Sequence, residues 1–391
     1  MNMLSKTLSQ LALIVAIIGI NLSCNGDNQG NKTGDVVEPR FVITDSLVVD
    51  YLGELKIMDI KPDRSEFLMF DFQRKEMVRV DSKGQILLAR NLTGDIKDGY
   101  GSSFISAHYH GYNEVLILTH QGFYSYDLSL NLIDSKDSPF AVFTNTAIGG
   151  HANLITDGAL FTNIYPDNFS REMFEQEDFL SQFPFLTVYD LEQEKILARQ
   201  YIPASCQMIK NKGEYRETAP FSIRDGDTIY LLFSYSPEIY QYSFPELELQ
   251  DTIHLEPGDV YVQIDPASPK AEAFDRFFNE LAASSYVGLY QSNGFLMTAY
   301  HGAAPREKVD ALPKNVVGGP EFSALRKQYK IPYYQLIKDG KKLWEGHLDV
   351  DFRYKGGRLF AYRNMHLPKV EEESDHVVFY FYEIEHEGRD T

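Results

Sequence analysis

The sequence predicts an all-β fold, a six-bladed β-propeller with short helical insertions. Three observations predict it: short segments that alternate apolar and polar residues recur six times, a further apolar strand precedes each of them, and one strand is left over near the N-terminal end. Alternation with a period of two is typical of a strand with one buried face. Repeated units of four antiparallel strands stack radially, because no unit can bury both faces alone. A pair of β-sandwiches or a seven-bladed ring is the alternative architecture.

Each recurring segment predicts a hairpin, because turn residues such as SKG, KDG and EHEG interrupt its alternation. The six segments are MVRVDSKGQILLAR from Met77, FYSYDLSLNLI from Phe123, LTVYDLEQEKILAR from Leu186, IYQYSFPELEL from Ile239, YQLIKDGKKLW from Tyr334 and FYFYEIEHEG from Phe379.

A second strand precedes each hairpin, and a polar turn separates it from a first strand. The second strands are EFLMF at Glu66, EVLILT at Glu114, ALFTNI at Ala159, TIYLLF at Thr228, GFLMTAY at Gly294 and RLFAY at Arg358, and the turns include KPDRS, ITDG, IRDG, QSNG and YKGG. Each unit therefore reads strand, turn, strand, loop, strand, turn, strand.

The sixth unit has no outer strand after Glu383, whereas FVITDSLVV at residues 41–49 is a strand without a unit. Pairing the two closes the ring and covers two exposed strand edges at once. We therefore expect residues 41–49 to form the outer strand of the last blade.

The N-terminus has the pattern of a lipoprotein signal peptide. Lys6 precedes the apolar run from Leu11 to Ile20, which is too short to span a bilayer comfortably, and Ser23 abuts Cys24. The site resembles a lipobox, although Asn21 stands where Leu is usual. We interpret residues 1–23 as a signal peptide, Cys24 as the lipidated residue, residues 24–35 as a flexible tether and residues 36–391 as the propeller. An uncleaved anchor or a plain secretory signal is the alternative.

Charge and cysteine content fit a location in the cell envelope, outside the cytoplasm. The net charge of −19 disfavours nucleic acid and anionic lipid as partners, so we expect membrane attachment through acyl chains alone. With Cys24 lipidated, Cys206 is the last thiol, and no internal disulfide can form. We expect a monomer.

The blade pattern is clearest in IKPDRSEFLMFDFQRKEMVRVDSKGQILLARNL, and it resembles a six-bladed propeller of the NHL or TolB-like kind. Most of the chain resembles a family of propeller lipoproteins from Gram-negative bacteria with no characterised function. This resemblance implies fold and location, and it supplies no catalytic residue.

Four insertions are expected on one face of the ring, near residues 165–184, 256–285, 301–332 and 364–376. Long insertions commonly serve binding, so this face is the predicted working face. The second insertion predicts a helix capped by Ser268, with an apolar stripe of Phe274, Phe277, Phe278 and Leu281.

Aromatic residues in the loops are the candidate binding residues, because those at strand period are expected to pack within blades. We assign to ligand contact Tyr165, Phe169, Tyr235, Tyr300, His301, Tyr329, Arg363 and His366. Packing is the alternative role for each aromatic.

No cofactor is predicted. His108 and His110 lie two apart on a strand, as a metal pair would, but no HExxH or CxxC spacing supports zinc. The NHL-like lactonases hold calcium in the central channel, and Asn163, Asn364 and Asp71 are the residues that could be placed in that way.

Two classes of function follow. The first is a non-catalytic binding or scaffold module for a peptide, glycan or partner protein, and it is the preferred interpretation. The alternative is a metal-dependent hydrolase of the lactonase type with its site at the channel mouth. No GxSxG, P-loop or Rossmann pattern points to another enzyme.

Overall fold

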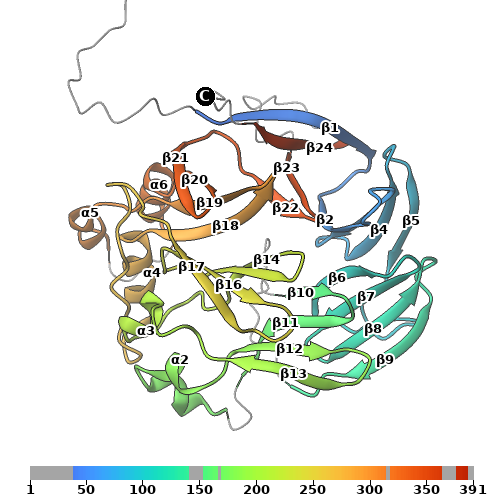
Figure 1. Cartoon of the computed structure of the whole chain (residues 1–391), viewed down its shortest axis with the longest axis horizontal. Coiled ribbons are helices and arrows are strands. Elements are labelled where there is room, and N and C mark those ends of the chain that lie inside the picture. Colours follow the sequence, from blue (N-terminus) through green and yellow to red (C-terminus); the bar gives the residue numbers. More distant parts are fainter. Residues whose placement is uncertain (1–37, 141–152, 166–168, 314–317, 363–375, 386–391) are drawn as a thin grey trace, which may run out of the picture. The chain divides into compact units, whose positions relative to one another are not determined.

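Six four-stranded antiparallel sheets stand around a common axis (Figure 1). This computed structural model describes residues 38–140, 153–165, 169–313, 318–362 and 376–385. The six-bladed β-propeller predicted from the repeats is confirmed, and the sandwich and seven-bladed alternatives are wrong. The signal peptide, Cys24 and the tether lie outside the described residues.

Each of the first five blades takes four consecutive strands, and the sixth takes the last three strands and the first. Blades one and two consist of β2 (Leu55–Ile60), β3 (Glu66–Asp71), β4 (Glu76–Asp81), β5 (Ile86–Asn91), β6 (Phe104–His110), β7 (Glu114–Thr119), β8 (Gly122–Asp127) and β9 (Leu132–Asp137). Blades three and four consist of β10 (Leu154–Thr156), β11 (Ala159–Asn163), β12 (Leu186–Asp190), β13 (Lys195–Gln200), β14 (Phe221–Asp225), β15 (Thr228–Leu232), β16 (Glu238–Ser243) and β17 (Leu249–His254). Blades five and six consist of β18 (Ser285–Ser292), β19 (Phe295–His301), β20 (Pro332–Lys338), β21 (Lys341–His347), β22 (Arg353–Lys355), β23 (Arg358–Tyr362), β24 (His376–Glu385) and β1 (Arg40–Asp50).

The N-terminal strand closes the ring as predicted. β1 pairs antiparallel with β24, with Leu47 opposite Phe379 and Val49 opposite Val377. Leu47 and Val49 are buried in one apolar cluster with residues of β2, β3 and β4, so this cluster joins the last blade to the first. The blue β1 lies outside the dark red β24 at the rim (Figure 1).

Burial changes from the middle of a blade to its rim. In the second strands β3, β7 and β11, every residue after the first is buried, whereas the outer strand β5 has no buried residue. The middle strands pack against blades on both sides, and their sequences are accordingly continuous apolar runs. The outer strands face solvent and read as mixed polar sequence.

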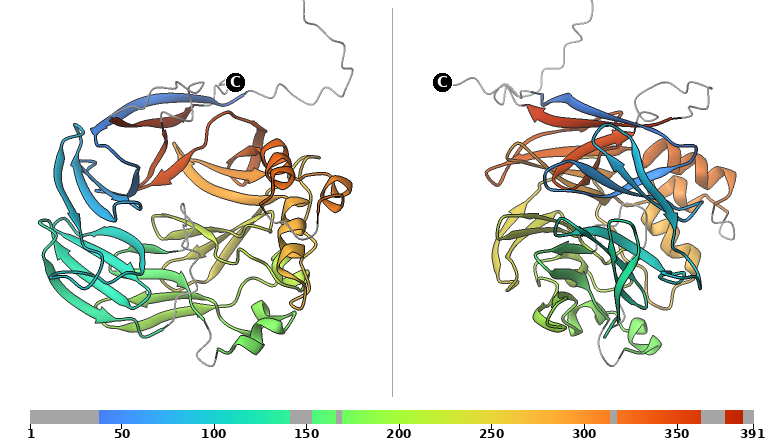
Figure 2. Two further views of the ribbon diagram at one scale, coloured as in Figure 1. Left: turned by 180° about the vertical axis from the view of Figure 1, so that it is seen from behind. Right: turned by 90° about the vertical axis from the view of Figure 1, so that its right-hand side faces the viewer.

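Short helices occupy the connections between the second and third strands of a blade or between consecutive blades. They are the 3₁₀ helix η2 (Arg171–Glu175), α2 (Phe179–Gln182), α3 (Gln207–Lys210), α4 (Ala273–Leu281), α5 (Arg306–Asp310) and α6 (Pro320–Tyr329). Because connections along an antiparallel blade alternate between its two ends, all of them lie on one face of the ring. The side view shows the orange helices gathered on one side (Figure 2). Among the described residues no helix is both long enough and apolar enough to span a membrane.

The helix predicted in the insertion at residues 256–285 begins later than expected. α4 begins at Ala273, after the extended residue Glu272, and Ser268 instead closes a separate turn in which its carbonyl accepts from Ala271 N at 2.8 Å. The turn at residues 268–271 is followed by the extended Glu272, so the helix begins only beyond it. The apolar stripe is confirmed, since Phe278 and Leu281 are buried against the other insertion helices.

Candidate functional site: a polar cavity on the propeller axis

A cavity of about 840 Å³ opens at the axis of the ring. Its walls are the ends of β2, β6, β10, β14 and β22, which are the first strands of five blades, together with the turns that follow them. These turns emerge on the face opposite the insertion helices, because they connect first strands to second strands. A cavity of this size suits a small organic ligand.

Glycine allows the turn after β22 to reach the end of β2. Gly356 has a φ of +52°, and a Cβ added to it would lie 2.6 Å from the Cβ of Ile60. Any larger residue at position 356 would push the turn away. This close approach places Lys355 beside Asp59.

Asp59 is directed into the cavity wall by a β-bulge. The pairing of β2 with β3 shifts register between Ile57 and Asp59, and a bulge re-aims the side chain that follows it. The Asp59 carboxylate accepts hydrogen bonds from Ile60 N and, across the blade boundary, from Tyr109 N, both at 2.9 Å. Burial raises the pKa of Asp59 to about 6, although these hydrogen bonds and the Lys355 ammonium act in the opposite direction.

Lys355 lines the cavity without an ion-pair partner among the described residues. Its side chain is half-buried, and no hydrogen bond or ion pair joins its ammonium to the described residues. Burial lowers the pKa of Lys355, and the negative charge of Asp59 opposes that shift. The Lys355 amino group therefore has hydrogen-bonding capacity that no described residue uses.

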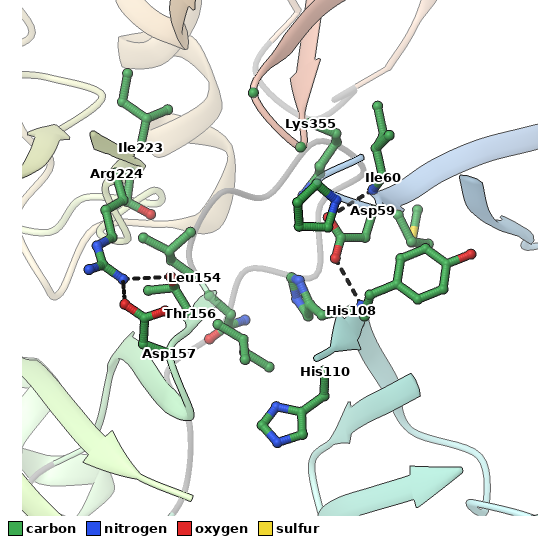
Figure 3. Close-up of a pocket in the computed structure, with 18 of the residues that line it drawn as sticks. Asp59, Ile60, His108, His110, Leu154, Thr156, Asp157, Ile223, Arg224 and Lys355 are labelled. Carbon is green, nitrogen blue, oxygen red and sulfur yellow. Dashed lines mark hydrogen bonds and ion pairs between the residues drawn. The ribbon is translucent and has the colours of Figure 1, made fainter. Parts of the chain in front are cut away.

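His108 is buried on β6, and its Nε2 has no hydrogen-bond partner within the described part of the chain. Burial lowers the pKa of His108 to about 3, with a contribution from Lys355, so the imidazole is neutral. His110 lies two residues further along the strand and also lines the cavity (Figure 3). An unpartnered buried polar atom costs free energy, and a ligand that bonded to it would recover that cost.

The opposite wall is already paired. Arg224 on β14 donates to the Thr156 hydroxyl at 2.6 Å and to the Asp157 carboxylate at 2.5 Å, and these bonds tie blade four to blade three. Figure 3 shows this group facing Asp59, His108 and Lys355 across the cavity. Each wall therefore carries one basic and one acidic side chain, and the unused hydrogen-bonding capacity lies on the side of Lys355.

Of the calcium residues suggested by the lactonase resemblance, the structure describes Asp71 and Asn163. The Asp71 carboxylate accepts four hydrogen bonds, from the Tyr51 hydroxyl and from the backbone N–H groups of residues 54, 73 and 74, so it is a turn residue. Asn163 is buried at the end of β11, and Asn364 lies outside the described residues. In the described ranges no group of three or more His, Cys, Asp or Glu is placed to hold a metal.

Two of the predicted binding residues meet on the insertion face. Tyr235 and His301 line one pocket of about 300 Å³ there. Tyr235 is buried, and its hydroxyl donates to Glu280 Oε1 at 3.4 Å.

Other predicted binding aromatics take packing roles. Tyr300 is fully buried in blade five, where its hydroxyl donates to Glu345 Oε1 at 2.6 Å. The Tyr329 hydroxyl accepts from Lys308 Nζ at 2.6 Å on the helical surface.

Of the remaining predicted contacts, the structure describes Tyr165 and Phe169. The ring centroids of Tyr165 and Phe169 lie 4.4 Å apart, and Phe169 packs on the core of blades three and four. Arg363 and His366 lie outside the described residues.

Asp59 and Lys355 were not among the predicted site residues, although the turn after Asp59 and the YKGG turn that contains Lys355 were identified. KPDRS, ITDG, IRDG and YKGG were interpreted only as turns, yet the strand ends at these four turns lie side by side on the axis. In a propeller the first strand of each blade borders the axis, so polar residues at those strand ends were the available signal.

Comparison with known proteins establishes the fold alone. No protein-family model and no curated protein matches the sequence. A solved structure of a member of the DUF4221 family from Bacteroides vulgatus is similar, with a TM-score of 0.62, 12% identity, and coverage of 90% of this chain and 100% of that one. A candidate exported protein from Bacteroides fragilis is similar with a TM-score of 0.53, 12% identity, and coverage of 92% and 98%. The resemblance to an uncharacterised propeller family is thereby confirmed at the level of fold.

Proposed function

We propose that this chain is a lipid-anchored binding protein of the cell envelope whose axial cavity holds a hydroxyl-rich ligand, such as the end of a glycan. The observation that carries the proposal is the group of Asp59, His108 and Lys355, which three different blades bring to one wall. Two of the three have hydrogen-bonding capacity that the described protein does not use.

A sugar hydroxyl fits this wall because it both donates and accepts. It can donate to Asp59 and accept from Lys355, and His108 Nε2 can bond to a neighbouring hydroxyl. The cavity carries equal numbers of cationic and acidic side chains, so it favours a neutral polar ligand over a strongly charged one. Tyr112 and Tyr354 on its lining offer aromatic faces for the apolar face of a sugar ring.

The proposed ligand contacts can be tested with purified mature protein and a panel of neutral oligosaccharides. Replacing Lys355 with Met should weaken binding at least about tenfold, because a hydrogen bond to a charged group contributes about 1.5 to 3 kcal/mol. Isothermal titration calorimetry measures this change.

Lys341→Met is the matched control, since it removes a lysine from the exposed first position of β21. Equal affinities of the wild-type protein and Lys355→Met would rule out the axial site, whereas equal losses in both variants would show an unspecific effect of charge.

The envelope location rests on the N-terminal pattern, and the candidate exported protein of similar fold supports it. We expect Cys24→Ala to lose its acyl chains and to move from the membrane fraction to the soluble fraction, since the acyl chains are the proposed anchor. Fractionation followed by immunoblotting measures the distribution. Cys206→Ala, which removes the buried thiol, is the control, and membrane association of Cys24→Ala equal to that of the wild type contradicts the anchor.

A further inference from the structure

The insertion face carries a second pocket, separate from the axial cavity. Its volume is about 300 Å³, and α4, α6, the end of β19 and the chain before β14 and after β15 form its walls. Its lining includes Arg216, Tyr235, Glu280, His301, Arg326 and Lys330. It shares no lining residue with the axial cavity.

Three cations meet in this pocket, although the chain as a whole carries a net charge of −19. Arg326 lies near the end of α6, Lys330 follows that helix, and Arg216 approaches from the connection before β14. Burial lowers the pKa of His301 to about 4, and the positive charges of Lys330 and Arg326 act in the same direction.

Two acidic residues, Glu217 and Glu280, line the pocket beside the three cations, and Glu280 is held by two hydrogen bonds. Glu280 accepts hydrogen bonds from Arg216 at 3.2 Å and from the Tyr235 hydroxyl at 3.4 Å. Arg216 also lies over the ring of Phe277 at 4.8 Å, which fixes it against α4. Arg326 also lines the pocket, and it makes no hydrogen bond or ion pair to any described residue. Its exposed guanidinium is therefore available to a ligand.

Lys330 is held in place by the backbone. Its Nζ donates to the carbonyl of Ala283, which leaves two further N–H groups of the ammonium for a ligand. Burial lowers the pKa of Lys330 to about 8, so the ammonium is mostly charged at pH 7 and loses its proton in mild alkali.

We propose that this pocket binds an oxyanion group, a carboxylate or a phosphate, with the Arg326 guanidinium and the Lys330 ammonium as donors. A guanidinium presents two parallel N–H groups that match two oxygens of either group. The neighbouring Phe277 and Phe322 rings give an apolar surface for the rest of the ligand. Glucuronate and inorganic phosphate are probes for the two sources of the oxyanion, and glucose is the neutral counterpart of glucuronate.

The test is calorimetric titration of the full mature protein at low ionic strength with each probe. We expect one or both anions to bind and glucose to bind more weakly at this pocket, and Arg326→Met should reduce anion affinity at least about tenfold. The matched control is Lys327→Met, the next residue of α6, which is exposed and does not line the pocket. It should change anion affinity less than twofold.

Arg326 is exposed, so the variant is expected to fold, and circular dichroism checks this. Equal losses in Arg326→Met and Lys327→Met would reduce the effect to overall charge and overturn the proposal, as would the absence of anion binding to the wild type. Lys355→Met should retain anion binding. The axial and insertion-face proposals can therefore fail independently.

Discussion

Replacing Val49 with Asp should lower the free energy of unfolding by at least about 4 kcal/mol. Val49 lies on β1 and is fully buried in the cluster that joins blade six to blade one. Residues of β2, β3 and β4 belong to the same cluster. The substitution loses about 1.5 to 3 kcal/mol of apolar burial and places an unpaired carboxylate in the same space, which costs several kcal/mol more. Urea denaturation followed by tryptophan and tyrosine fluorescence measures the loss.

The neighbouring residue Val48 is the control. Its side chain is 49% exposed on the other face of β1, so Val48→Asp should cost no more than about 1 kcal/mol. If both variants unfold at the same denaturant midpoint, the seam does not hold the ring together in the way that the pairing of β1 with β24 implies.

Replacing His108 with Gln should make the protein more resistant to acid. The folded-state pKa of His108 is about 3 and its ordinary value is 6.5, so the stability it contributes is present above pH 6.5 and is lost as the pH falls toward 3. Between pH 6.5 and pH 4.5 this is a loss of about 2 kcal/mol, because the dependence reaches its full slope of about 1.36 kcal/mol per pH unit only well below pH 6.5. The wild type should therefore lose about 2 kcal/mol more than His108→Gln over this interval, as measured by urea denaturation at both pH values.

Asp59 changes the free energy of unfolding with pH in the opposite direction to His108, and it does so equally in the wild type and in His108→Gln. Its pKa is raised to about 6, so the stability it contributes is largest at low pH and decreases as the pH rises through 6. Lys355 is common to both proteins as well. His254→Gln, at an exposed position on β17, is the control and should leave the pH dependence unchanged. Identical slopes for the wild type and His108→Gln would mean that His108 becomes protonated without unfolding the protein.

The fold could be predicted because each strand carries its own signal. The alternation in residues 41–49 marks a strand with one buried face, and the absence of an outer strand after Glu383 identifies its partner without any long-range information. The hairpin turns are also local: the Asp81 carboxylate accepts from the backbone N–H of Lys83 at 2.8 Å and of Gln85 at 2.9 Å, so the residues of the turn determine it.

The axial site could not be predicted in the same way, because its residues come together only when the ring closes. Asp59 and Lys355 are far apart in the sequence, and their approach depends on a bulge in β2 and on the positive φ of Gly356. The 201–220 connection with α3 was missed for a related reason. It has no periodic pattern, and it is fixed by tertiary contacts such as the burial of Cys206 and Met208 in the core of blades three and four.

The most direct test of the axial binding site is a crystal structure of the mature protein with the oligosaccharide that binds most tightly. We expect sugar hydroxyls within hydrogen-bond distance of the Asp59 carboxylate and the Lys355 ammonium, and one hydroxyl bonded to His108 Nε2. A sugar bound elsewhere on the protein, with none in the axial cavity, would contradict this expectation.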